Sequence, residues 1–198
     1  MMRARARAGG LIASLALLAG AGCSSPTPVF YSMHGDARMS EASVPATMSI
    51  VVSPVTVPDL VDRPQMVTRT ADNRIELNEF ARWAEPLKTD IARVIAADLS
   101  QRLATARVSV LDTGAGGLPQ WYVRVDIVSI DSVPGDAVTI AAQWTVRPPA
   151  KGAALLGRSV AREPVGGRDD GALVAAHERA RGAISEEIAA AIRAGVPQ

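Results

Sequence analysis

Apolar residues recur three and four positions apart in two long segments of the chain. In the first segment they are Leu87, Ile91, Val94, Ile95, Leu99 and Leu103. In the second segment they are Leu173, Ala176, Ala180, Ile184, Ile188 and Ile192. This spacing places each set along one face of an amphipathic helix that needs a sheet to cover. Pro86 suits the first turn of the first helix, and Asp169 is a natural N-cap for the second.

Elsewhere the apolar residues alternate with polar ones, as they do in strands. Residues 121–133 and 138–146 alternate on either side of Pro134-Gly135, which predicts a long antiparallel hairpin. Shorter extended runs lie at 48–57, 65–70, 74–80, 107–112 and 155–163. We therefore predict a single two-layer α/β (α+β) domain over residues 47–198. Its mixed, mainly antiparallel sheet carries both long helices on one face.

The charged residues of the first helix suggest a solvated face. Asp90 stands three residues before Arg93, and Asp98 stands four before Arg102. Opposite charges at these spacings stabilise a helix by a few tenths of a kcal/mol, about 0.2–0.5 for each pair. We expect both pairs to lie on the face opposite the apolar stripe.

The first 22 residues have the pattern of a lipoprotein export signal. Three arginines precede an apolar run, Leu11 to Ala21, that is too short to span a bilayer permanently. Small residues stand directly before Cys23, as lipoprotein signal peptidase requires, although Gly20 occupies the usual leucine position. Cys23 is the single cysteine of the chain and has no disulfide partner in it. We expect residues 1–22 to be removed and Cys23 to be acylated; an ordinary cleaved signal with an incidental cysteine is the alternative.

Residues 23–46 are rich in Ser, Pro, Thr and Gly and suggest a lipidated tether. Ser24 stands where aspartate would favour inner-membrane retention in Gram-negative bacteria, so we expect the periplasmic face of the outer membrane. Residues 29–33 nevertheless have strand character. If they join the sheet, the free tether shrinks to Ser24–Pro28 and reaches about 20 Å. If they are loose, the reach is several times longer.

Three motifs carry a resemblance to a known family. They are Phe30-Tyr31, the run from Leu60 to Arg69 (Leu-Val-Asp-Arg-Pro-Gln-Met-Val-Thr-Arg), and Arg82-Trp83-Ala84-Glu85-Pro86-Leu87 before the first helix. In this order they resemble the PqiC-type ABC-transport auxiliary lipoproteins. The likeness is specific over 30–33 and 50–103 and elsewhere concerns only the order of elements. It implies an outer-membrane lipoprotein that partners a periplasm-spanning tunnel protein of the MCE (mammalian cell entry) class, of the PqiB type.

The motifs also supply candidates for partner contact: Asp62, Arg63, Arg69, Trp83 and Glu85. Prolines at 58 and 64 should keep the loop that carries Asp62 and Arg63 ordered. The loop would then lose little conformational entropy when it binds a partner. A planar guanidinium suits such a surface. The alternative is that Arg63 pairs with Asp62 or Glu85 and only secures the loop. For Trp83, a place in the core is the more ordinary expectation.

Charge and composition exclude several kinds of function. Without the signal, 18 basic residues face 20 acidic ones, which argues against nucleic-acid binding because that needs a concentrated basic face. His34 and His177 stand apart, and we expect His177 to be partly buried or solvated beside the second helix's stripe. Gly114 to Gly117 lacks the lysine and helix of a phosphate-binding loop. We expect no catalytic residue, no metal and no cofactor.

Three hypotheses about function remain at this point. The first is a non-catalytic subunit that docks an envelope-spanning transport tunnel onto the outer membrane and supports envelope integrity. The second is a periplasmic lipid-binding carrier whose layers part around an acyl chain, which requires a cavity of several hundred Å³, about 300–1,000. The third is an exported enzyme of unrecognised type. Association of several copies is an open possibility for each.

Overall fold

The structure is a computed structural model of residues 1–198. It describes residues 26–35, 48–70, 72–105, 107–110, 120–149 and 152–196. The elements in chain order are β1 (Val29–Tyr31), β2 (Ser49–Val52), β3 (Gln65–Arg69), β4 (Ile75–Trp83), α2 (Leu87–Arg102), β5 (Val108–Ser109), β6 (Gln120–Ser132), β7 (Ala137–Arg147), β8 (Leu155–Pro164) and α3 (Asp170–Gly195). Cys23, most of the expected tether and Gly114 to Gly117 lie outside the described residues.

Five strands form the large sheet, in the order β5-β2-β6-β7-β8. The predicted hairpin is its centre: β6 and β7 pair antiparallel over their length, and Gly135 takes φ +73° in the turn between them. β8 adds an antiparallel edge strand, whereas β2 runs parallel to both β5 and β6. The expected α+β class and the mixed character of the sheet are confirmed.

Three strands form a separate small sheet, in the order β1-β4-β3, which the alternating pattern alone did not predict. After β2 the chain follows β6 as far as Thr56, whose N–H donates to Val125 O at 3.3 Å, and then turns away at Pro58. Both edges of β2 are occupied, by β5 and β6. The β3–β4 hairpin therefore finds no free edge there, and β4 pairs in parallel with β1 instead.

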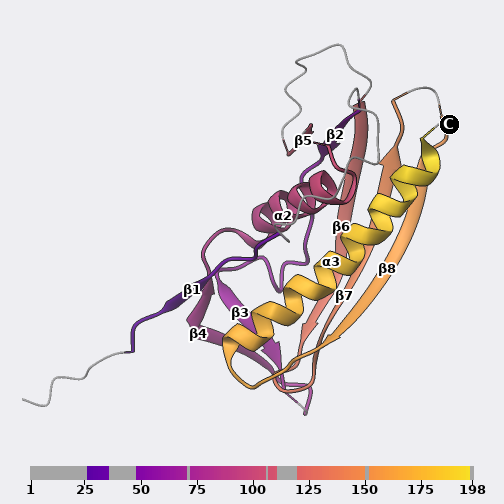
Figure 1. The fold of residues 1–198 in the computed structure, drawn as a ribbon. Helices are drawn as coiled ribbons and strands as arrows, with labels where there is room; N and C mark the ends of the chain where they lie inside the picture. The colour runs from indigo at the N-terminus through magenta and orange to yellow at the C-terminus, as the bar shows by residue number, and fades with distance from the viewer. Residues whose placement is uncertain are drawn as a thin grey trace, which may run out of the picture.

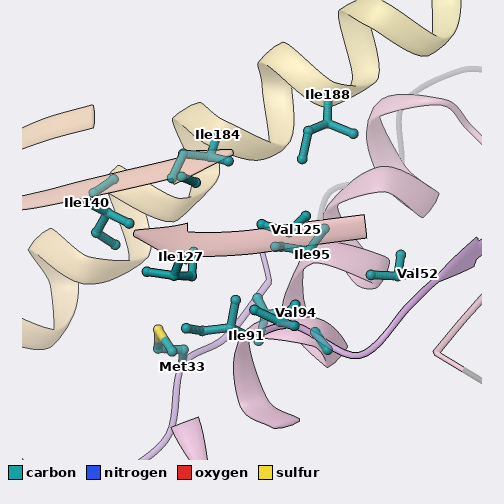
Figure 2. Close-up of a cluster of buried hydrophobic side chains, with 14 of the residues drawn as sticks. Met33, Val52, Ile91, Val94, Ile95, Val125, Ile127, Ile140, Ile184 and Ile188 are labelled. Atoms are coloured by element: carbon teal, nitrogen blue, oxygen red, sulfur yellow. The ribbon is translucent and has the colours of Figure 1, made fainter. Parts of the chain in front are cut away.

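Both helices lie in front of the large sheet in Figure 1, on the same face. All residues of the two predicted apolar stripes are buried in one core with the inward residues of the strands. Figure 2 shows Ile184 and Ile188 of α3 above Val125 of β6, with Ile91 and Ile95 of α2 in the same cluster. Asp169 caps α3 as expected, accepting a hydrogen bond from Ala172 N at 2.9 Å.

The acidic residues of α2 contradict the expectation of a solvated face. Asp90 and Asp98 are each only 1% exposed. Asp98 does not pair with Arg102 but forms an ion pair with Arg181 of α3, which is buried as well. Arg102 pairs with Glu186 of α3. Asp90 does pair with Arg93, but from a buried position.

These buried carboxylates hold the segment that follows β1. Asp90 Oδ2 accepts a hydrogen bond from Met33 N at 3.0 Å, and Arg93 donates to Met33 O at 3.2 Å. Arg181, paired with Asp98, donates to His34 O at 3.1 Å. The Met33 side chain, 1% exposed, lies in the cluster of Ile91 (Figure 2). The N-terminal segment is therefore fastened to both helices by polar and apolar contacts.

Replacing Asp98 by alanine would leave the charge of Arg181 buried without its partner. Removal of one member of a buried ion pair costs about 3–5 kcal/mol, so the free energy of unfolding of Asp98→Ala should fall by that amount in urea denaturation. The matched control is Arg162→Ala, which breaks an exposed pair with Asp136 and should cost at most about 1 kcal/mol. Equal losses in the two variants would contradict a structural role of the buried pair.

Candidate functional site

The small sheet brings the three sequence motifs together. Trp83 N donates to Pro64 O at 2.7 Å, which joins the end of β4 to the start of β3. Ala84 N donates to Tyr31 O, also at 2.7 Å, which joins the same end of β4 to β1. The segments around Tyr31, Pro64 and Ala84 thus meet at one end of the small sheet.

The loop between Pro58 and Pro64 is ordered by its own backbone. The N–H groups of Val61 and Asp62 both donate to Pro58 O, at 3.0 and 3.1 Å. The Val61 side chain is buried in the core and holds the loop against it. Asp59, Leu60, Asp62 and Pro64 of this loop are exposed, and Arg63 is half-buried. Such a preorganised loop loses little conformational entropy when a partner binds.

Neither of the two pairs that would secure Arg63 is formed. Asp62 pairs instead with Lys88 at 3.0 Å, and Glu85 lies 3.6 Å from Arg93. All four side chains are at least about one-third exposed, so each pair stabilises the fold by about 0–1 kcal/mol. Asp62 and Glu85 therefore tie the loop and the end of β4 loosely to α2.

Arg63 itself forms no ion pair with any of the described residues. The residue is half-buried, and its Nε is shielded from solvent without a hydrogen-bond acceptor. A buried donor without an acceptor is uncommon in a folded protein. A guanidinium can donate to a carboxylate or to backbone carbonyls at two points at once. The geometry thus leaves Arg63 with unused hydrogen-bonding capacity in an ordered loop.

Arg69 is committed to an internal contact. Its Nε and Nη2 donate to the two carboxylate oxygens of Asp131 on β6, at 2.7 and 2.6 Å. These hydrogen bonds hold the pKa of Asp131 below its ordinary value and raise that of Arg69. A third bond runs from Arg69 to Asn73 Oδ1 at 3.1 Å, within the β3–β4 hairpin. The residue links the small sheet to the large one.

Trp83 lies in the core, 5% exposed. Its ring meets that of His177 edge to face, with centroids 5.4 Å apart and an interplanar angle of 83°. His177 is fully buried, contrary to the expectation of a partly buried or solvated side chain. Burial lowers its pKa to about 4, so the ring is neutral at pH 7. Its Nε2 lies 2.9 Å from Ser132 Oγ, which provides the polar partner that a buried ring needs.

The buried Asp98–Arg181 pair is the part of this arrangement that sequence reasoning missed. A signal existed: Asp98 stands four residues after Val94 and seven after Ile91, so it shares their stripe. Arg181 likewise stands three residues before Ile184. A charge of each sign within two facing apolar stripes is the pattern that a buried pair leaves in a sequence.

No cluster of three or more His, Cys, Asp or Glu residues that could hold a metal ion occurs among the residues that the structure describes. Neither described helix combines the length and the hydropathy that crossing a membrane requires.

Comparison with known proteins places this fold. Residues 31–189 match the family of ABC-type transport auxiliary lipoprotein components, and the chain belongs to that family. The match begins at the last residue of β1 and ends within α3, so it includes β2 to β8, α2 and most of α3. The resemblance based on the three motifs is thereby confirmed. Among curated proteins no match was found.

Two crystal structures share the fold. One, of an uncharacterized protein, superposes with a TM-score of 0.70 at 20% identity, covering 84% of this chain and 99% of the other. The second is protein XCC0632 from Xanthomonas campestris, of the DUF330 family, with a TM-score of 0.63 at 17% identity. It covers 81% of this chain and 92% of the other. The family is one of transport auxiliary lipoproteins, and the two structures show the same fold.

The Trp83→Ala variant tests whether the indole is a core residue or a contact for a partner. Removing a buried tryptophan should lower the free energy of unfolding by about 3–5 kcal/mol, since the cavity that it leaves lies against His177. A thermal melt measures this loss. Phe80→Ala, which removes an aromatic ring that is 48% exposed, is the matched control and should melt close to wild type. An unchanged melt of Trp83→Ala with lost partner binding would instead make Trp83 a contact residue.

Proposed function

We propose that this chain is a non-catalytic outer-membrane lipoprotein subunit of an MCE/ABC-type lipid transport system. In this role it docks a periplasm-spanning tunnel protein of the PqiB type onto the outer membrane. Membership of the family makes the chain an auxiliary lipoprotein of ABC-type transport. We propose in addition the tunnel protein as its partner, the outer membrane as its location and docking as its role.

The observation that carries the docking role is the unpaired guanidinium of Arg63. It is held by an ordered loop at the end of the small sheet where the motifs meet. Its neighbours Asp62 and Glu85 have other ionic partners, so binding to Arg63 would break no ion pair within this chain. A carboxylate or a strand edge of the partner would bind the terminal Nη donors of Arg63, whereas its Nε is shielded from solvent.

The interior of the domain supports docking over lipid carriage. Between the helices and the sheets, the residues around Met33, Ile91 and Ile184 enclose a cavity of only about 10 Å³. Carrier cavities are about 300–1,000 Å³. The larger hollows lined by described residues are open surface grooves, such as that between α2 and β5. An acyl chain would have to part a close-packed core to enter.

The proposed attachment to the membrane is the acylated Cys23. The sorting argument from Ser24 favours the outer membrane, and the family is one of lipoproteins. With β1 paired to β4, only Ser24 to Pro28 separate the lipid from the folded domain. The docking surface would then be presented close to the membrane surface.

The Arg63→Ala variant tests docking. We expect stability within about 1 kcal/mol of wild type, since Arg63 forms no ion pair to lose, while binding of the purified MCE-type partner weakens about tenfold or more. Biolayer titration and a thermal melt on the same preparation give the two quantities.

Arg158→Ala, which removes an exposed arginine of β8 on the large sheet, is the charge-matched control and should bind normally. Unchanged binding of Arg63→Ala with a lowered melting temperature would make Arg63 a structural residue. The docking surface would then have to lie elsewhere.

The Cys23→Ala variant, exported with a cleavable signal from another secreted protein, tests the anchor. The domain should fold and appear in the soluble periplasmic fraction, because the acyl chains supply most of the membrane affinity. Fractionation followed by immunoblotting measures this, with wild type in the outer-membrane fraction as control. Persistence of the alanine variant in outer membranes after a high-salt wash would show that lipidation is not its attachment.

A further inference from the structure

The two phenylalanines of the chain both lie at the surface of the small sheet. Phe30 of β1 is 63% exposed and Phe80 of β4 is 48% exposed. Phenylalanine is among the residues most often buried, because its ring has no polar group. We refer to these two residues as the phenylalanine patch; exposed apolar surface of this kind marks an interaction site when it is clustered.

The two exposed rings lie on adjacent strands of the small sheet. Tyr31 pairs with Trp83, whose side chain is buried, so the preceding pair, Phe30 and Arg82, points outward. Phe80 stands two residues before Arg82, at a bulge of β4 where the pairing with β3 shifts between Asn78 and Arg82, and its side chain is exposed.

The charged residues beside the patch, Arg82 and Glu79, form an ion pair and so add no net charge to it. Arg82 stands between the rings in the register, and its Nη2 lies 2.7 Å from Glu79 Oε2. The Nε of Arg82 also donates to Glu79 O at 3.0 Å. Val29, which precedes Phe30 on the edge strand, pairs with the buried Ala81 and so points to the opposite face of the sheet; it is not part of the patch.

The position of the lipid anchor suggests what covers this patch. Six peptide units join Cys23 to Val29, and fully extended they span about 20 Å. Residues 26–30 are all exposed. In Figure 1, β1 reaches out from the body of the molecule, and residues 26–28 before it lie farther from the helices. The acyl chains would therefore hold a bilayer surface within reach of β1.

We propose that the phenylalanine patch is a second membrane contact, in which Phe30 and Phe80 enter the interfacial region of the same leaflet that holds the acyl chains. The inference rests on the acylated Cys23 of the proposed function but not on the tunnel partner. Aromatic rings are favoured at this depth of a bilayer. A domain held by a tether alone is free to rotate, whereas a second contact fixes which of its faces points into the periplasm.

The lipidated full chain offers a direct test, because acylation consumes its only thiol. A cysteine introduced by Phe80→Cys, and in a second variant by Phe30→Cys, can be labelled alone with an environment-sensitive fluorophore. The labelled proteins are placed in vesicles of phosphatidylethanolamine and phosphatidylglycerol that carry bromine near the headgroup end of the acyl chains. We expect bromine to quench most of the fluorescence at both positions.

The matched control is Leu156→Cys, since Leu156 is an exposed apolar residue, 78% exposed, on the edge strand of the large sheet. Its label should keep its fluorescence in the same vesicles. Two variants guard against misfolding of one of them, which a thermal melt of each detects.

Two outcomes would overturn the proposal while leaving the anchor intact. One is protein that floats with the vesicles but whose labels at positions 30 and 80 are quenched no more than the label at 156. The other is a spectral change at those positions that occurs only when the MCE-type partner or a second copy binds. Failure of the wild-type lipidated chain to float with vesicles would instead contradict the Cys23 anchor itself.

Discussion

Two buried carboxylates of α2 join the N-terminal segment at Met33 and His34 to α2 and to α3 near the C-terminus. Asp90 and Asp98 of α2 are desolvated, and such charges are tolerated only when they are paired and hydrogen-bonded. Arg181 of α3 provides the charge for Asp98 and at the same time holds the backbone of His34. The N-terminal segment, α2 and α3 therefore depend on one another: separating the helices would leave Asp98 and Arg181 unpaired, and removing the N-terminal segment would take hydrogen bonds from Asp90 and Arg181.

This arrangement determines where the chain can meet its surroundings. Because Met33 and His34 are fastened to the helices, β1 is held in place and can pair with β4. The small sheet then carries on one side the loop with Arg63 and at its surface the phenylalanine patch. One contact is charged and suited to a protein partner, and the other is apolar and suited to lipid. In the proposed function, a short tether from an acylated Cys23 would let both contacts act near the same membrane.

The close-packed interior fits a subunit that joins other components better than one that carries a ligand inside. The helices use their apolar stripes fully on the sheet, and the cavity that the described residues enclose around Met33, Ile91 and Ile184 has a volume of only about 10 Å³. Arg69 and Trp83, which the motifs suggested as contacts, serve inside the domain: one links the two sheets and the other fills the core beside His177. What is left for recognition is at the surface.

The sequence by itself determined the two helices, the β6–β7 hairpin, the cap at Asp169 and the family, because these depend on spacings and turn residues within short stretches of chain. Tertiary structure alone decided which strand edges were free, and hence that β1 and the β3–β4 hairpin form a second sheet. It also decided that Asp98 pairs with Arg181, 83 residues away, and not with Arg102 on its own helix. The helical spacing alone would allow Asp98 to pair with Arg102. Burial selects Arg181 instead, because a charge inside the core needs a partner that is also in the core.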